Sequence, residues 1–251
     1  MRQLDLNADV GEGEREAEAA LLPLVTSVNV ACGLHAGDPD IMRATVALAV
    51  NYGIAVGAHP GFNDREGFGR RPRSLTRLEL TDLLLYQMGA LHAVARAEGA
   101  VLRHVKPHGA LYNQAADDRA LAEGIIDAVR LFDPTLRLVG RAGSAIETAA
   151  RVLDHPFSPE AFADRRYLPD GSLLPRTERG AILTEPDEVA AQVHALVTQG
   201  EVRASDGSRV RVAFETLCLH GDTPGSEALA ARVRRELREL GVTISAPGAN
   251  P

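Results

Sequence analysis

Short apolar runs alternate with longer segments of helical period along almost the whole chain, and this alternation limits the folds that the sequence can adopt. The runs are rich in β-branched residues, as buried strands are, and the segments between them are long enough for helices. Such alternation predicts βα units around a parallel sheet. We expect strands at residues 3–7, 27–31, 54–58, 101–105, 137–140, 157–162 and 216–219.

The segments between the expected strands carry signals for helix ends. Thr76 and Glu79 form a capping-box pattern, Gly99 follows the end of the same helix, and Pro39 stands in the first turn of another. No linker divides the chain, so about seven βα units predict a single barrel domain, residues 1–251, with a frayed tail at 246–251. Helices are expected at residues 39–52, 76–98, 117–131, 144–153, 186–199 and 225–240, and a hairpin turn at 204–208.

Most of the unusual polar residues lie at or just after the carboxyl ends of these strands. In an α/β barrel those ends share one face, and catalytic residues gather there from several strands. Histidines recur in four of these loops, and we expect at least two of them to line a site. The polar residues concerned are Asp5, Asn7, Asp9, Glu12, Asn29, Cys32, His35, Asp38, His59, Lys106, His108, His220 and Asp222.

Lys106 is the only lysine among 27 lysine and arginine residues. A chain that uses arginine for its other cations keeps an ammonium where a guanidinium does not serve, and an ammonium can bind carboxylate or phosphoryl oxygens as a point donor. Pro107 and His108 follow directly, at an expected strand end. Lys106 is therefore the first candidate site residue, and a chance surface lysine is the alternative.

Charge and motifs exclude several classes of function. A net charge of −7 and the lack of a basic run argue against nucleic-acid binding as the main function. The chain has no apolar stretch that could cross a bilayer, no apolar signal segment and only two cysteines, so a cytoplasmic location is expected. Phosphate-loop, dinucleotide-binding and Gly-x-Ser-x-Gly motifs are missing, so we expect no cofactor bound by a recognisable motif.

Each candidate also has a structural interpretation. Asp9 and Glu12 could cap a short helix that follows them, while Asp5 and Asn7 alternate with leucines and could satisfy each other inside the barrel. Cys32 is more typical of a small buried residue than of a nucleophile. Clusters of histidine and carboxylate suit zinc, but no compact ligand pair such as His-x-x-x-His is present, so a metal is the minority interpretation.

Seven segments carry recognisable motifs: DLNADVGE (5–12), NVACGLHAGDP (29–39), GAHPG (57–61), GFGRR (67–71), KPHGALYN (106–113), FADR (162–165) and HGDTP (220–224). Together they resemble the LamB/YcsF family, whose members act as the A subunit of the bacterial ATP-dependent 5-oxoprolinase. The resemblance runs in order from residue 3 to residue 244. It departs from the family pattern at Asn63, where proline is expected, and at Pro159, which interrupts the strand that leads to Asp164.

The resemblance implies a distorted seven-stranded (β/α) barrel of the glycoside hydrolase/deacetylase type, acting together with partner subunits B and C. The implied reaction opens the lactam of 5-oxo-L-proline to L-glutamate, with ATP as a co-substrate of the complex. A five-membered lactam is resonance-stabilised, so its hydrolysis needs an activation that phosphorylation of the lactam oxygen provides. A chain without a phosphate loop then supplies water, a base and an anion site.

On this hypothesis the catalytic residues are Asp9, His59, Lys106 and His108. Asp9 or His108 deprotonates water, and Lys106 binds carboxylate or phosphoryl oxygens. The alternatives are a stand-alone metal-dependent deacetylase that acts on an amide or a polysaccharide, and a non-catalytic subunit that binds 5-oxoproline. The expected substrate-binding residues are Asn7, Glu12, His35, Asp164, Arg165, His220 and Asp222.

Overall fold

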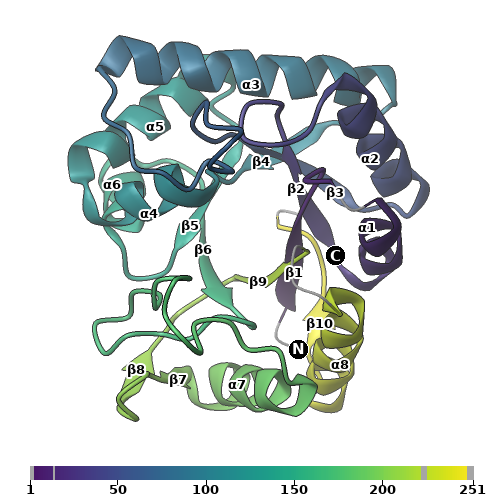
Figure 1. Ribbon diagram of the computed structural model, residues 1–251, viewed down its shortest axis with the longest axis vertical. Helices are drawn as coiled ribbons and strands as arrows, with labels where there is room; N and C mark the ends of the chain where they lie inside the picture. Colours follow the sequence, from purple (N-terminus) through teal and green to yellow (C-terminus); the bar gives the residue numbers. More distant parts are fainter. Residues whose placement is uncertain (1–2, 14, 222–224, 248–251) are drawn as a thin grey trace.

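The computed structural model describes residues 3–13, 15–221 and 225–247. Within this part, parallel strands close into a barrel because the last barrel strand, β9, pairs with both β6 and β1. Helices surround the barrel (Figure 1), and the predicted β/α barrel is confirmed. The described residues form seven barrel strands: β1 (Gln3–Val10), β2 (Ser27–Ala31), β3 (Ala55–His59), β4 (Leu102–Val105), β5 (Arg137–Arg141), β6 (Phe157–Phe162) and β9 (Thr216–His220).

Each expected helix is present, and Thr76 and Glu79 form the expected capping box. The helix α4 was not predicted. It begins at Gly109 with a φ of 54°, where a Cβ atom would lie 2.7 Å from the carbonyl oxygen of Gly69, so its start depends on a tertiary contact. The helices are α1 (Arg15–Leu21), η1 (Leu22–Leu24), α2 (Pro39–Asn51), α3 (Arg77–Ala97), α4 (Gly109–Asp117), α5 (Arg119–Phe132), α6 (Ala145–Val152), α7 (Pro186–Gln199) and α8 (Ser226–Glu239).

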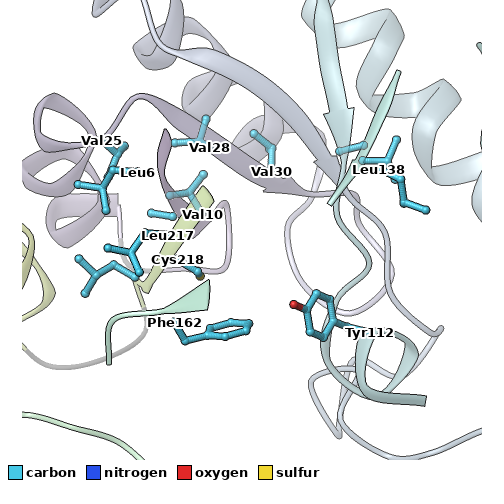
Figure 2. Close-up of a cluster of buried hydrophobic side chains, with 14 of the residues drawn as sticks. Leu6, Val10, Val25, Val28, Val30, Tyr112, Leu138, Phe162, Leu217 and Cys218 are labelled. Atoms are coloured by element: carbon cyan, nitrogen blue, oxygen red, sulfur yellow. The ribbon is translucent and has the colours of Figure 1, made fainter. Parts of the chain in front are cut away.

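The first strand shows how the barrel divides polar from apolar residues. Successive side chains of a strand point to opposite faces, and the side chains of Leu6 and Val10 point outward from the barrel. Leu6 packs near Val25 and Val28 in the core between strands and helices (Figure 2). The alternate residues Asn7 and Asp9 point inward and bond to polar groups of other strands. The barrel interior is therefore polar, and the hydrophobic core surrounds it.

The remaining elements lie outside the barrel. β7 (Glu201–Arg203) and β8 (Arg209–Arg211) form the expected antiparallel hairpin, and β10 (Thr243–Ile244) pairs with the start of β1. Between β6 and α7 the chain makes a long excursion without a helix, residues 163–185 (Figure 1). No helix among the described residues is long and apolar enough to span a membrane. Residues 248–251 of the expected tail lie outside the described residues.

Candidate active site

A pocket of about 490 Å³ opens at the carboxyl ends of the barrel strands. Its lining combines carboxylates, histidines and a lysine with several arginines, and the excursion between β6 and α7 contributes part of its wall. This is the face that carries the active sites of β/α barrels. The ionisable residues that line it are Asp9, Glu12, His59, Arg70, Lys106, His108, Tyr112, Asp117, Arg141, Arg165, Arg176 and His220.

Lys106 directly follows β4, and its ammonium lies between two carboxylates. Nζ is 2.9 Å from Oδ1 of Asp9 and 2.9 Å from Oε1 of Glu160. The rings of Phe162 and Tyr112, whose centroids lie 5.6 and 6.0 Å from Nζ, point toward one another across this space (Figure 2). Burial alone would lower the pKa of the ammonium, but the acidic groups around it, Asp9, Cys218 and Glu160, hold this pKa well above its usual value. Lys106 is a buried cation, and the alternative of a chance surface lysine is wrong.

Asp9 lies on β1 itself, so the alternative that it caps a helix is wrong. Its Oδ1 accepts a hydrogen bond from Asn29 Nδ2 at 2.8 Å, and its Oδ2 lies 3.5 Å from Nε2 of His59. The same Asn29 amide also donates to Oδ1 of Asn7 at 2.8 Å. Burial raises the pKa of Asp9, but His59 and Lys106 together hold this pKa well below its usual range. Asp9 is therefore an ionised carboxylate at the pocket.

Three histidines from different loops surround the carboxylate of Glu12. Oε1 of Glu12 lies 3.2 Å from His35 Nε2, 3.3 Å from His108 Nδ1 and 3.9 Å from His59 Nε2. Burial raises the pKa of Glu12, but its contacts with His108 and His35 hold this pKa well below its usual value. Burial also lowers the pKa of His35 to about 3, so this ring is neutral. One atom of each of the four residues lies within 4.8 Å of the others, and the group could hold a metal ion.

His220, the last residue of β9, is held by Asp164. Nδ1 of His220 lies 3.0 and 3.1 Å from the two oxygens of Asp164, and the backbone N–H of His220 donates to Oδ2 at 3.0 Å. Burial raises the pKa of Asp164, but His220 keeps it below its usual value. Because a carboxylate only accepts, the proton of the neutral ring is on Nδ1, and Nε2 carries the lone pair. The pair has the form of an oriented acid–base group.

Arg165 holds the excursion that forms part of the pocket wall. Its Nε donates to the carbonyl of Ala181 at 3.3 Å, and its Nη2 donates to the carbonyl of Leu174 at 2.7 Å. Burial lowers the pKa of the guanidinium to about 10. Arg165 therefore fastens this segment to the end of β6 and also lines the pocket.

A family model described as the LamB/YcsF family matches residues 4–250. The chain belongs to the LamB/YcsF family. Among its relatives, the A subunit of 5-oxoprolinase from Methylococcus capsulatus is 52% identical, over 98% of this chain and 96% of the relative. The protein of the same name from Symbiobacterium thermophilum is 50% identical, over 100% of this chain and 97% of the relative.

Solved structures place this LamB/YcsF protein in the same fold. The lactam utilization protein from Thermus thermophilus superposes with a TM-score of 0.90 at 44% identity, covering 98% of this chain and 100% of that one. A family 4 carbohydrate esterase from Streptomyces lividans has a TM-score of 0.53 at 11% identity, over 98% of this chain and 92% of that one. At so low an identity the likeness concerns the fold alone, and it confirms the expected deacetylase type of barrel.

The structure brings most of the predicted site residues of this LamB/YcsF protein to one pocket, but three lie behind its surface. Asn7, His35 and Asp164 are almost completely buried and are not part of the pocket lining. They lie behind residues that line the pocket, and their role in substrate binding stays a prediction. Asp222 lies outside the described residues. The predicted residues that line the pocket are Asp9, Glu12, His59, Lys106, His108, Arg165 and His220.

Two residues that the sequence did not single out complete the centre. Glu160 binds Lys106, and the hydroxyl of Tyr112 donates to Oε2 of Glu160 at 2.7 Å. Pro159 obscured the inward position of Glu160, although β6 continues through this proline. Strand alternation back from Phe162 could have placed Glu160 on the inner face. Tyr112 lies on the unpredicted helix α4, and its position beside Lys106 in the KPHGALYN motif was the available signal.

Proposed function

We propose that this chain is the A subunit of a 5-oxoprolinase, which opens 5-oxo-L-proline to L-glutamate together with partner subunits B and C and with ATP as co-substrate. The observation that carries the proposal is the 52% identity to a relative of that name over nearly the full length of both chains. The pocket supports it, because it combines cations that suit a carboxylate or a phosphoryl group with groups that can transfer a proton.

We assign anion binding to the arginines of the pocket wall. Arg70, Arg141 and Arg176 line the same pocket, and a guanidinium presents a planar pair of donors to a carboxylate or phosphoryl group. Arg141 also binds the largely exposed carboxylate of Asp117 at 2.9 Å, whereas the partners of Lys106 are buried. Lys106 is already engaged by Asp9 and a second carboxylate, so its role is to hold Asp9 in place and to supply a fixed positive field. In this assignment the substrate carboxylate binds the arginines of the pocket wall, and the lactam carbonyl points toward Lys106.

We assign proton transfer to His220. A base works best when its pKa lies near the working pH, and Asp9 has a pKa held well below that range. Asp9 therefore suits the orientation of water and the stabilisation of positive charge better than proton abstraction. His220 lines the pocket with its Nδ1 fixed by Asp164, so Nε2 can take a proton from water and return it to the ring nitrogen that leaves.

The reaction is tested by reconstitution. The purified chain alone should release no appreciable glutamate from 5-oxoproline and ATP, because its sequence has no recognisable phosphate loop. The chain with its candidate partner subunits should release glutamate and phosphate together. ATP-dependent turnover by the chain alone, or none by the complete complex, would overturn the assignment.

Two other functions would give different experimental outcomes. A stand-alone deacetylase would release acetate from an acetylated amide or sugar without partners or ATP, and this activity would have to depend on a bound metal. A non-catalytic binding subunit would bind 5-oxoproline tightly, yet substitution of His220 or Asp9 would leave the turnover of the complex unchanged. Loss of turnover with retained complex formation supports the catalytic assignment.

A further inference from the structure

The cluster around Glu12 is built from loops that the sequence keeps far apart. Glu12 follows β1, His59 ends β3 and His108 caps α4, and all three line the pocket. His59 and His108 are almost fully buried, with 1% and 5% of their surface exposed. Their ring planes are nearly perpendicular, at 89°, so they approach the carboxylate from different directions.

Backbone carbonyls fix the hydrogen positions on both rings. Nδ1 of His59 lies 2.7 Å from the carbonyl oxygen of Lys106, and Nε2 of His108 lies 2.8 Å from that of Phe68. A carbonyl oxygen only accepts hydrogen bonds, so each ring carries a proton on its outer nitrogen. Their inner nitrogens, Nε2 of His59 and Nδ1 of His108, both face Glu12, and each can present a lone pair there once it carries no proton. Second partners of this kind are typical of histidines that bind metals.

These two nitrogens and the carboxylate oxygen surround a point that one cation can occupy, which is a proton when no metal is bound. The two inner nitrogens are only 3.0 Å apart, and both face the anionic Oε1 of Glu12 at 3.9 and 3.3 Å. In a tetrahedral zinc site with bonds of about 2.0–2.1 Å, neighbouring ligand atoms are about 3.3–3.4 Å apart. The observed separations lie around this value. The cluster therefore already has nearly the spacing of a three-ligand metal site.

We propose that Glu12, His59 and His108 bind one divalent transition-metal ion, of the zinc class, with an open coordination position toward the pocket. Two imidazole nitrogens and one carboxylate oxygen suit zinc rather than magnesium or calcium, which prefer oxygen ligands. Three protein ligands and an open position are the pattern of catalytic rather than structural zinc sites. A metal bound there would polarise a carbonyl oxygen or activate water.

His35 orients the carboxylate instead of binding the ion. Its ring stacks on His108 with centroids 3.8 Å apart and planes within 2°, and two parallel rings cannot both direct an in-plane lone pair at one point. His35 is fully buried behind the pocket, and its Nε2 lies 3.2 Å from Glu12 Oε1. Gly61 and Gly69 make this stack possible, because a Cβ atom at either would lie 2.8 Å from His35.

The test uses the full chain without partner subunits, so its outcome does not depend on the oxoprolinase assignment. The protein is stripped with a chelator and titrated with ZnCl₂ and, as a coloured probe, CoCl₂. We expect one ion per chain. Glu12→Gln, His59→Gln and His108→Gln should each weaken zinc binding by more than about 100-fold, and His35→Gln, which removes an orienting partner, by about 10- to 100-fold.

His194→Gln is the matched control, because this half-exposed histidine pairs with Glu236 far along the chain and should leave the affinity unchanged. Far-UV circular dichroism establishes that each variant folds. If a ligand variant fails to fold, X-ray absorption of the zinc-loaded wild-type chain decides, and it should show two imidazole ligands and a carboxylate. The proposal is overturned by the lack of saturable binding, by unchanged affinity in the folded ligand variants, or by a ligand shell without imidazole.

Discussion

Asp5 and Asp9 are the same residue type on the same strand, and both are buried inside the barrel, yet their surroundings make them opposite in character. Asp9, at the carboxyl end, meets the Lys106 ammonium at 2.9 Å and stays ionised. Asp5, at the amino end, accepts hydrogen bonds from the hydroxyls of Thr26, Ser27 and Thr216 at 2.5–2.9 Å. Burial raises the pKa of Asp5 to about 6.

A nearby cation, and not burial, therefore decides which of these two buried aspartates is charged. Hydroxyl donors lower the pKa of Asp5 but do not compensate for the loss of water, whereas Lys106 and His59 compensate for it at Asp9. Asn7 lies between the two aspartates, and it donates to Thr216 and to Glu160. The end of the polar interior at Asp5 is thus held by neutral hydrogen bonds, and the end at Asp9, where the pocket opens, carries charged groups.

The largest effect is expected from Asp9→Asn. The substitution keeps the shape but removes the negative charge between Lys106 and His59, so the turnover of the reconstituted complex should fall by about 100-fold or more. Glutamate release at saturating substrate measures it. Asp5→Asn is the matched control and should keep turnover within about twofold of the wild type. Equal losses in both variants would contradict the division between the two ends.

Lys106→Arg should have the next largest effect. The ammonium is a point charge held between Asp9 and Glu160, and a planar guanidinium cannot occupy the same point. Loss of a charge-assisted contact predicts a drop of about 10- to 100-fold in kcat/KM. The exposed Arg43, which pairs with Glu98, provides a control, because Arg43→Lys should change the free energy of unfolding by less than about 0.5 kcal/mol. Unaltered kcat/KM in the Lys106 variant would show that the ammonium has no special role.

Much of the fold and the centre of the site could be predicted from the sequence. Strand and helix periodicity is a local property, so the order of the expected strands and helices was predicted correctly, and most of their ends were predicted to within one residue. Lys106, at the centre of the pocket, could be identified from the sequence because it is the single lysine in a chain that otherwise uses arginine. Strand alternation also placed Asp5 and Asn7 inside the barrel, although they are linked through Thr216 rather than to each other.

Other features depend on contacts that sequence spacing does not reveal. The sequence disfavours a metal because it lacks a ligand pair within one helix, whereas Glu12, His59 and His108 come together from separate loops. His104, within the expected strand 101–105, points into the barrel, and its Nε2 lies 2.7 Å from Asn29 Oδ1. It fits there because Gly57 on the neighbouring strand leaves the space, since a Cβ atom would lie 2.1 Å from the ring. Whether a side chain such as His104 fits inside the barrel therefore depends on a residue far from it in sequence.

Asp164→Asn should have a smaller effect that extends the comparison to a third buried aspartate. Asp164 faces His220 instead of a lysine, and it does not line the pocket, so it acts by holding the ring. We expect kcat to fall by about tenfold with KM within about twofold, since a positioning residue makes no contact with substrate. Steady-state kinetics of the reconstituted complex measure both constants. A rise in KM with unchanged kcat would indicate direct substrate binding instead.

Asp5→Asn should have the smallest effect on turnover, but it should change how stability depends on pH. Because burial raises the pKa of Asp5 from 3.8 to about 6, the folded protein keeps a proton that the unfolded chain releases between about pH 4 and pH 6. Stability contributed by this group is therefore full below pH 4, falls as the pH rises through this window, and stays at the lower level above it. A rise in the pKa of Asp5 from 3.8 to about 6 corresponds to about 3 kcal/mol.

Asparagine cannot ionise, so this fall should be missing from the variant. Urea unfolding of both proteins from pH 4 to pH 7 measures it, and the difference between the two curves cancels groups that titrate alike in both. The free energy of unfolding of Asp5→Asn should rise relative to the wild type by about 3 kcal/mol across the window, then run parallel above pH 6. Parallel curves throughout would mean that Asp5 ionises as easily in the folded protein as in the unfolded chain, and that the hydroxyls of Thr26, Ser27 and Thr216 fully replace water.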